Sequence, residues 1–367
     1  MTETKDLSIY IHIPFCEQKC IYCAFNSFCA SEQVRNEYID LLCKEIENRK
    51  VKRPIKTIYI GGGTPSVLTA NQIEKIVKCV YDNFDVYEDA EFTIEANPNS
   101  ISEELLKVWK SLRVNRLSIG VQSLSDKSLK KIGRLHDKKM AVEKIKLARH
   151  YFDNISADLI VGLEGETGKD LCSYAKTLLG LGVKHISCYL LEIYKNTKLY
   201  QEIVQKKYKP LGDEQMIDSF NKLANYLQDM GMERYEISNF AFPGYESRHN
   251  LNYWARGEYL GFGLSAHSYM DGKRIQNAGA ISDYKLGKQE IEVLSKKDEI
   301  EEEIMLGLRC KLGVDIWKVK KMGYDITQNQ FFKDYLAEGV LKLENDKLFL
   351  NPIFYHISNT IISNLFS

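Results

Sequence analysis

The sequence predicts an α/β fold in which crossover helices cover a parallel sheet. Three observations lead to this class. Short β-rich runs alternate with amphipathic helical stretches six times along the chain. The 367 residues are enough for a sizeable core and about two domains. Apolar residues make up 44% and charged residues 27%, a composition typical of globular rather than disordered chains.

The repeats begin near the N-terminus and continue to about residue 229. The predicted strands cover residues 8–13, 57–60, 91–95, 116–119, 156–160 and 185–190. The predicted helices cover residues 31–48, 71–81, 103–111, 138–151, 169–179 and 213–229, and Ser or Asn precedes several of them as a capping residue. This alternation predicts a parallel sheet, but it does not by itself distinguish an open sheet from a barrel.

The pattern changes after Gly231. A further strand is predicted over residues 233–238, followed by an irregular stretch rich in aromatic residues. From about residue 298 the sequence predicts two or three helices and a hairpin of strands 340–343 and 347–350. We therefore expect an α/β domain at residues 1–235, an aromatic-rich connecting segment at 236–297 and a small C-terminal α+β domain at 298–367. A winged-helix arrangement is one option for the last part.

Charge balance and cysteine content narrow the functional classes. Lys plus Arg (50) equals Asp plus Glu (50), so the basic surface of a nucleic-acid-binding protein is not expected. The polar, acid-containing N-terminus does not resemble a signal peptide, and no run of 18 apolar residues predicts a membrane helix. We therefore expect a cytoplasmic protein. Its nine cysteines would stay reduced there, and clustered ones would serve as metal ligands or in catalysis.

The strongest local signal is a group of three cysteines directly after the first predicted strand. Three residues separate Cys16 from Cys20, and two separate Cys20 from Cys23. A loop with this spacing can give three irons of an iron–sulfur cube one thiolate each. The fourth iron then stays open to an external ligand, as in catalytic metal sites. A structural zinc site is the alternative; it prefers four ligands in paired C-x₂-C units, and Cys29 would be the fourth.

The spacing Cys-x₃-Cys-x₂-Cys is the motif of the radical S-adenosylmethionine (SAM) superfamily. The wider run of residues 10–28 resembles the branch that contains oxygen-independent coproporphyrinogen III oxidase and the heme chaperone HemW. This resemblance, which extends to about His267, implies a partial, open (β/α)₆ barrel of the TIM type. It also implies that SAM binds the open iron of a [4Fe–4S] cluster. One-electron reduction then splits SAM into methionine and a 5′-deoxyadenosyl radical, a step whose chemistry the cofactor carries.

A cradle for a ligand is expected at the carboxyl ends of the strands. Gly61, Gly62 and Gly63 follow the second strand, and the absence of Cβ atoms lets a ligand approach the backbone there. Glu95 and Asp158 interrupt otherwise apolar strands, where an unpaired charge would be costly. The resemblance assigns SAM contacts to Tyr10, Tyr22, Gly62, Gly63, Thr64, Glu95, Gln122, Arg134 and Asp158.

Two features distinguish the members of this branch. The oxidase carries a fourth cysteine two residues after the third, where this chain has Phe25. Residues 249–254, with the sequence HNLNYW, look like the HNxxYW motif of the HemW group. The imidazole of His249 beside aromatic rings suits an axial heme ligand, and a histidine packed in an aromatic core is the alternative. His267 and Cys310 are further candidates with less support.

The sequence therefore favours a heme chaperone that binds a [4Fe–4S] cluster, SAM and heme. Its partners would be acceptor hemoproteins, membrane-bound respiratory enzymes among them, and the protein would then be peripheral to the membrane. If SAM is cleaved, an electron donor such as flavodoxin or ferredoxin is required. Two alternatives stay open. One is an enzyme, a coproporphyrinogen III oxidase that decarboxylates propionates by hydrogen abstraction, and the other is a non-redox zinc-binding module.

Overall fold

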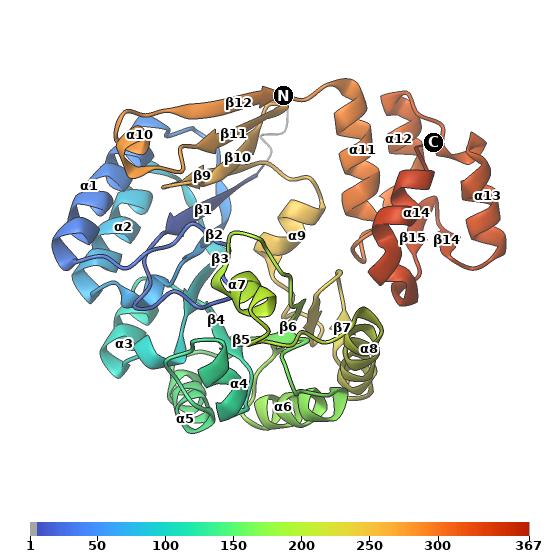
Figure 1. Ribbon diagram of the computed structural model, residues 1–367. Helices are drawn as coiled ribbons and strands as arrows, with labels where there is room; N and C mark the ends of the chain where they lie inside the picture. Colours follow the sequence, from blue (N-terminus) through green and yellow to red (C-terminus); the bar gives the residue numbers. More distant parts are fainter. Residues whose placement is uncertain (1–5, 367) are drawn as a thin grey trace.

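The computed structural model describes residues 6–366, and its central feature is an open sheet with helices along its outer side (Figure 1). Six parallel strands come in chain order: β1 (Leu7–Ile13), β2 (Ile55–Gly62), β3 (Val86–Ala96), β4 (Arg116–Gln122), β5 (Asn154–Val161) and β6 (His185–Leu190). The helices between them are α1 (Glu32–Asn48), α2 (Ala70–Asn83), α3 (Glu103–Ser111), α4 (Asp126–Lys131), α5 (Lys138–Arg149) and α6 (Gly168–Gly180). The predicted fold class is confirmed, and the sheet is not closed.

Strand β1 shows how the sequence builds the two faces of this sheet. Ile9, Ile11 and Ile13 are fully buried in the apolar core that the helices share with the sheet. The intervening Ser8 and Tyr10 point to the opposite, inner face, as expected for a strand whose side chains alternate. Polar residues recur at the inward positions of the other strands, so the interior is not an apolar core. Buried polar groups require partners, which makes this interior suited to a polar ligand.

The sheet continues beyond both ends of the six parallel strands. Strand β9 (Tyr259–Phe262) pairs in parallel with β1 and is followed by antiparallel β10 (His267–Met270), β11 (Lys273–Asn277) and β12 (Gln289–Val293). On the other side, β8 (Asn239–Ala241) and β7 (Glu233–Arg234) run antiparallel beside β6. The stretch after residue 236, predicted to be irregular, thus contains five short strands, and the strand predicted over 233–238 is two residues long.

Four helices belong to the later part of the α/β region or to its extension. They are α7 (Lys198–Val204), α8 (Asp213–Asp229), α9 (Arg248–Trp254) and α10 (Ile281–Lys285). Helix α8 coincides with the predicted helix over residues 213–229. No helix within residues 6–366 combines the length and the apolar character needed to cross a membrane.

The C-terminal part has its own buried apolar cluster, which includes Ile304, Leu308 and Leu348, and lies beside α8 and α9 (Figure 1). Its elements are α11 (Lys296–Gly307), β13 (Val314–Asp315), α12 (Ile316–Met322), α13 (Gln330–Ala337), β14 (Leu341–Glu344), β15 (Lys347–Leu350), the 3₁₀ helix η4 (Pro352–Ile357) and α14 (Ser358–Asn364). The predicted hairpin is present, with Asn345 and Asp346 at positive φ in its turn. The domain boundaries and the winged-helix arrangement stay predictions.

Candidate functional site

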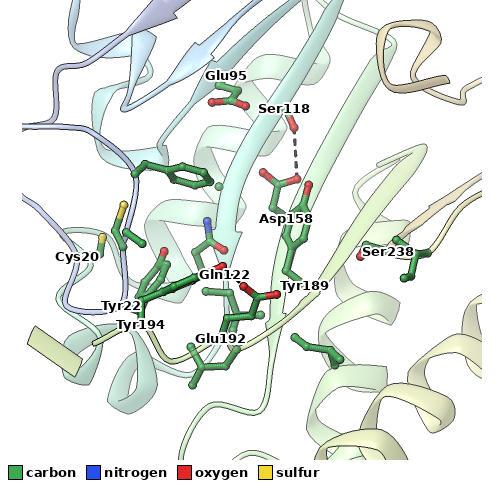
Figure 2. A pocket seen from close by; sticks show the side chains of 18 of the residues that line it. Cys20, Tyr22, Glu95, Ser118, Gln122, Asp158, Tyr189, Glu192, Tyr194 and Ser238 are labelled. Carbon is green, nitrogen blue, oxygen red and sulfur yellow. Dashed lines mark hydrogen bonds between the residues drawn. The ribbon is translucent and has the colours of Figure 1, made fainter. Parts of the chain in front are cut away.

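A cavity of about 940 Å³ lies where the carboxyl ends of the parallel strands meet. Figure 2 shows Glu95, Ser118 and Asp158 directed into it from neighbouring strands. The three cysteines, the nine residues assigned to SAM and His249 make thirteen predicted site residues. Eleven of them line this cavity: Cys16, Cys20, Tyr22, Cys23, Gly62, Gly63, Thr64, Glu95, Gln122, Arg134 and Asp158. Parallel strands place their carboxyl ends at one edge of a sheet, which is why residues so far apart in the chain converge.

The cysteine loop is held in place by backbone hydrogen bonds at both ends. The N–H of Cys16 donates to the carbonyl of Phe28 (3.1 Å), and the N–H of Phe28 donates to the carbonyl of Pro14 (2.9 Å). Further along, the N–H of Ile21 donates to the carbonyl of Ile132 (3.2 Å). The loop therefore folds back on itself and is attached to the chain after α4, so its thiols keep a fixed position at the edge of the cavity.

The three thiols differ in their surroundings. Burial raises the pKa of the thiols of Cys16 and Cys23 above the ordinary value. The hydroxyl of Thr64 lies 3.5 Å from Sγ of Cys16 and opposes that rise in pKa, and Nη1 of Arg134 lies 3.6 Å from Sγ of Cys20. Because a bound metal stabilises thiolates far more than hydrogen bonds do, such thiols lose their protons when a metal binds.

The glycine-rich turn after β2 packs directly against the cysteine loop. Gly62 has φ of +113°, which favours glycine, and its N–H points to the Glu95 carboxylate. A Cβ on Gly63 would come within 2.7 Å of the carbonyl oxygen of Phe15 and 2.8 Å of that of Ile13. The N–H of Gly63 in turn donates to the latter carbonyl (2.8 Å). Only glycine allows this approach, so the turn and the loop behave as one unit.

Two acidic side chains form the floor of the cavity. Glu95 accepts hydrogen bonds from the hydroxyl of Tyr59 (2.7 Å) and the N–H of Gly62 (2.9 Å). Burial nevertheless raises the pKa of Glu95 to about 7. Asp158 accepts from the hydroxyl of Ser118 (3.3 Å), and burial raises its pKa as well. A cationic ligand beside these carboxyls would hold both in the ionised form, so the floor favours a ligand that carries positive charge.

Asn97 is a central polar residue that was not singled out in the sequence. Its Nδ2 donates to the hydroxyl oxygen of Thr64 (2.9 Å), and its Oδ1 accepts from Nη2 of Arg134 (2.6 Å). The same guanidinium donates to the carbonyl of Gly120 (2.5 Å). Asn97 therefore connects the glycine-rich turn with the residue that contacts Cys20. Its position two residues after Glu95, on the same face of the strand end, was the available signal.

Comparisons with known proteins agree with this geometry. Residues 10–178 match the family model described as the radical SAM superfamily, and residues 294–352 match the HemN C-terminal domain. The chain is 37% identical to the heme chaperone HemW of Lactococcus lactis over 95% of its own length and 92% of the relative's. It is 39% identical to HemW of Bacillus subtilis, with 84% of each chain covered.

The chain belongs to the HemW family of radical SAM proteins.

A solved structure, coproporphyrinogen III oxidase (HemN) from Escherichia coli, superimposes with a TM-score of 0.85 over 98% of this chain and 90% of that one, at 22% identity. At this identity the match establishes the fold, including the open parallel sheet and the C-terminal part. HemW of Escherichia coli itself is 36% identical over 75% of this chain and 74% of that protein.

Membership in the HemW family implies a [4Fe–4S] cluster and SAM, and the residues fit these groups. Three thiols line one end of the cavity. Cys29 does not line it; its side chain is exposed, and its Sγ donates to the carbonyl of Glu17 (3.1 Å). Within residues 6–366 no three Cys, His, Asp or Glu side chains converge on one point as a single metal ion requires. A cube takes each thiolate on a different iron, so the separated thiols suit it. When bound, cluster and SAM supply one-electron chemistry, and the protein binds, orients and shields them.

Two of the predicted site residues lie outside the cavity. The hydroxyl of Tyr10 is bonded to Nδ1 of His12 (2.9 Å), and burial raises its pKa far above the ordinary value. His249 is buried, with Nδ1 bonded to the hydroxyl of Thr57 (2.7 Å) and Nε2 to that of Tyr253 (2.8 Å). Burial lowers the pKa of this imidazole to about 3. Both ring nitrogens are thus engaged inside the protein, and the structure does not bring His249 to the ligand cavity.

Proposed function

We propose that this protein is a heme carrier that binds a [4Fe–4S] cluster and SAM and passes heme to acceptor hemoproteins. The proposal rests first on the extent of its similarity to proteins named heme chaperone HemW, which covers 95% of the chain in one case. Cys16, Cys20 and Cys23 would hold the cluster. Tyr22, Gly62, Gly63, Thr64, Glu95, Gln122, Arg134 and Asp158 would surround SAM. Tyr10 is assigned to SAM by the resemblance alone, since it does not line the cavity.

The observation that carries the proposal is that one continuous cavity extends from the three thiols to a wall of aromatic and aliphatic side chains. Figure 2 shows Cys20 and Ser238 on opposite sides of it, with Tyr189 and Asp158 between them. The volume of about 940 Å³ is near the upper end of the range of about 300–1,000 Å³ typical of small-molecule sites. A large, flat, mainly apolar ligand therefore has room beside the cluster end.

The test is an anaerobic heme titration of the reconstituted protein, followed by mixing with apomyoglobin. We expect saturable binding of about one heme per chain and transfer of that heme to the apoprotein. Absence of heme binding would overturn the proposal. Formation of protoporphyrinogen when the same protein is incubated with coproporphyrinogen, SAM and a reductant would also overturn it, because this result would define an enzyme rather than a carrier.

The proposal includes the acceptors and the electron source. Membrane-bound respiratory enzymes would receive heme from a protein that is peripheral to the membrane at that moment. A flavodoxin or ferredoxin would be needed only if SAM is cleaved during delivery. Measuring 5′-deoxyadenosine during heme transfer decides this point: its formation in step with transfer would make the donor a partner, and complete transfer without it would remove the donor from the proposal.

A further inference from the structure

The part of the cavity farthest from the thiols has walls from three separate regions. They are the end of β6 with Tyr189 and Leu190, helix α8 with Phe220, and η4 with Ile353. Several of these apolar side chains are exposed at the rim, Tyr189 by 46% and Ile353 by 61%. An exposed apolar rim beside a cavity is typical of a ligand site, because water contact with such side chains is unfavourable unless a ligand covers them.

This wall contains a free imidazole. The protein has seven histidines, and among them only His356 lines the cavity. Four others are buried, each with at least one ring nitrogen hydrogen-bonded: His12, His136, His185 and His249. His150 and His267 are exposed elsewhere. In the part of the chain that the structure describes, the exposed ring of His356 has no hydrogen-bond partner, so its nitrogens are available to a metal.

The same wall contains a guanidinium that lacks a counter-ion. Arg234 lies between the rings of Phe220 (4.7 Å to the centroid) and Tyr355 (4.6 Å) and lines the cavity. Its two Nη atoms donate to backbone carbonyls, and its buried Nε has no hydrogen-bond partner. No carboxylate within residues 6–366 comes within ion-pair distance of it, and burial lowers its pKa to about 10, although the charge of Glu236 acts in the opposite direction. A partly buried cation without an ion-pair partner is costly, so this position favours an anionic ligand group.

We infer that heme binds in this half of the cavity, with the imidazole of His356 on the iron and a propionate on Arg234. The inference rests on the proposed function and assigns its heme site. Heme combines the three properties that the wall complements: a flat apolar ring, an iron that takes a neutral imidazole, and carboxylates. The C-terminal segment thereby contributes the axial ligand, and the half with the three thiols stays free for cluster and SAM.

The test is an optical titration of the full-length, reconstituted protein with hemin. Wild type is expected to give the spectrum of imidazole-ligated heme. His356→Ala should lose this spectrum and bind at least about tenfold more weakly, since even groups that only orient metal ligands cost about 10–100-fold when removed. Added imidazole should restore the spectrum. His150→Ala, which changes an exposed histidine at the end of α5, away from the cavity, is the matched control and should behave as wild type.

Two results separate this inference from the proposed function. If wild type does not bind hemin, both fail. If wild type binds hemin and His356→Ala gives the same spectrum and affinity, the assigned ligand is wrong and the carrier function stands. The propionate contact is tested on wild type without any substitution: hemin dimethyl ester, which has no free carboxylate, should bind more weakly than hemin. Arg234→Gln should abolish that preference, and equal binding of the two probes to wild type would remove Arg234 from the site.

Discussion

A substitution at Gly63 tests most directly whether the glycine-rich turn after β2 and the cysteine loop are packed together as one unit. In Gly63→Ala the new Cβ would meet three backbone atoms: the carbonyl oxygens of Phe15 (2.7 Å) and Ile13 (2.8 Å) and the N–H nitrogen of Phe15 (3.0 Å). Backbone atoms cannot rotate away as a side-chain end can, so the cysteine loop must shift. Overpacking of this kind costs about 1–3 kcal/mol.

The shift also weakens bonds that hold the loops together. The N–H of Gly63 donates to the carbonyl of Ile13 and that of Thr64 donates to the carbonyl of Phe15, both at 2.8 Å. Each such bond contributes about 1 kcal/mol. The free energy of unfolding of the apoprotein should therefore fall by about 2–4 kcal/mol. Because Cys16 follows Phe15 directly, iron content after anaerobic reconstitution should fall as well.

The assay is urea denaturation of the apoprotein, with iron and sulfide determination on the reconstituted protein. Gly180→Ala is the control, because a Cβ at Gly180, the last residue of α6, meets no atom within 4 Å. This variant should be as stable as wild type or more stable by up to about 1 kcal/mol, since alanine favours helix. If Gly63→Ala unfolds like wild type and takes up full iron, the two loops are not held together as described.

Two further predictions concern the cysteines that bind the cluster and the buried carboxyl of Glu236. Cys20→Ala should lose most iron on reconstitution, whereas Cys29→Ala should keep it, because Cys29 does not line the cavity; iron loss in Cys29→Ala would revive a four-cysteine site. Burial raises the pKa of Glu236 from 4.5 to about 7. The folded protein therefore loses stability as the pH rises from about 4.5 to 7 and this carboxyl has to ionise. The stability of Glu236→Gln relative to wild type, measured by urea denaturation, should therefore increase by up to about 3 kcal/mol between pH 4.5 and 8. Exposed Glu214→Gln should show no such trend, and a flat difference for Glu236→Gln would contradict the assigned burial penalty.

Local sequence patterns predicted the six parallel strands, since short β-rich runs alternate there with amphipathic helical stretches. They could not predict the extension of the sheet. Strand β9 (Tyr259–Phe262) pairs with β1 (Leu7–Ile13) about 250 residues earlier in the chain, and no local pattern encodes so distant a partner. Strand β11 is short and polar, KRIQN, and lacks the apolar alternation that indicates a strand. Strand β12, QEIEV, has only two apolar residues, and both are exposed.

In the candidate site, too, some residues could be predicted from the sequence and others only from the structure. The residues at strand ends converge because the fold class itself requires it, so Glu95 and Asp158 could be identified in advance. His249 is buried because Thr57 and Tyr253 hydrogen-bond to its two ring nitrogens. These partners cannot be predicted from the residue types in the sequence. The wall formed by η4 comes from the far end of the chain. His356 could therefore be recognised only once the structure placed it against the cavity.

The central claim is that the three thiols leave one iron of the cube open to SAM inside this cavity. Electron paramagnetic resonance of the reduced, anaerobically reconstituted protein tests it most directly. The account predicts a reduced-cluster signal that changes when SAM is added, because SAM would bind the open iron, and no such signal from Cys20→Ala. A cluster signal that stays the same at saturating SAM would contradict the account.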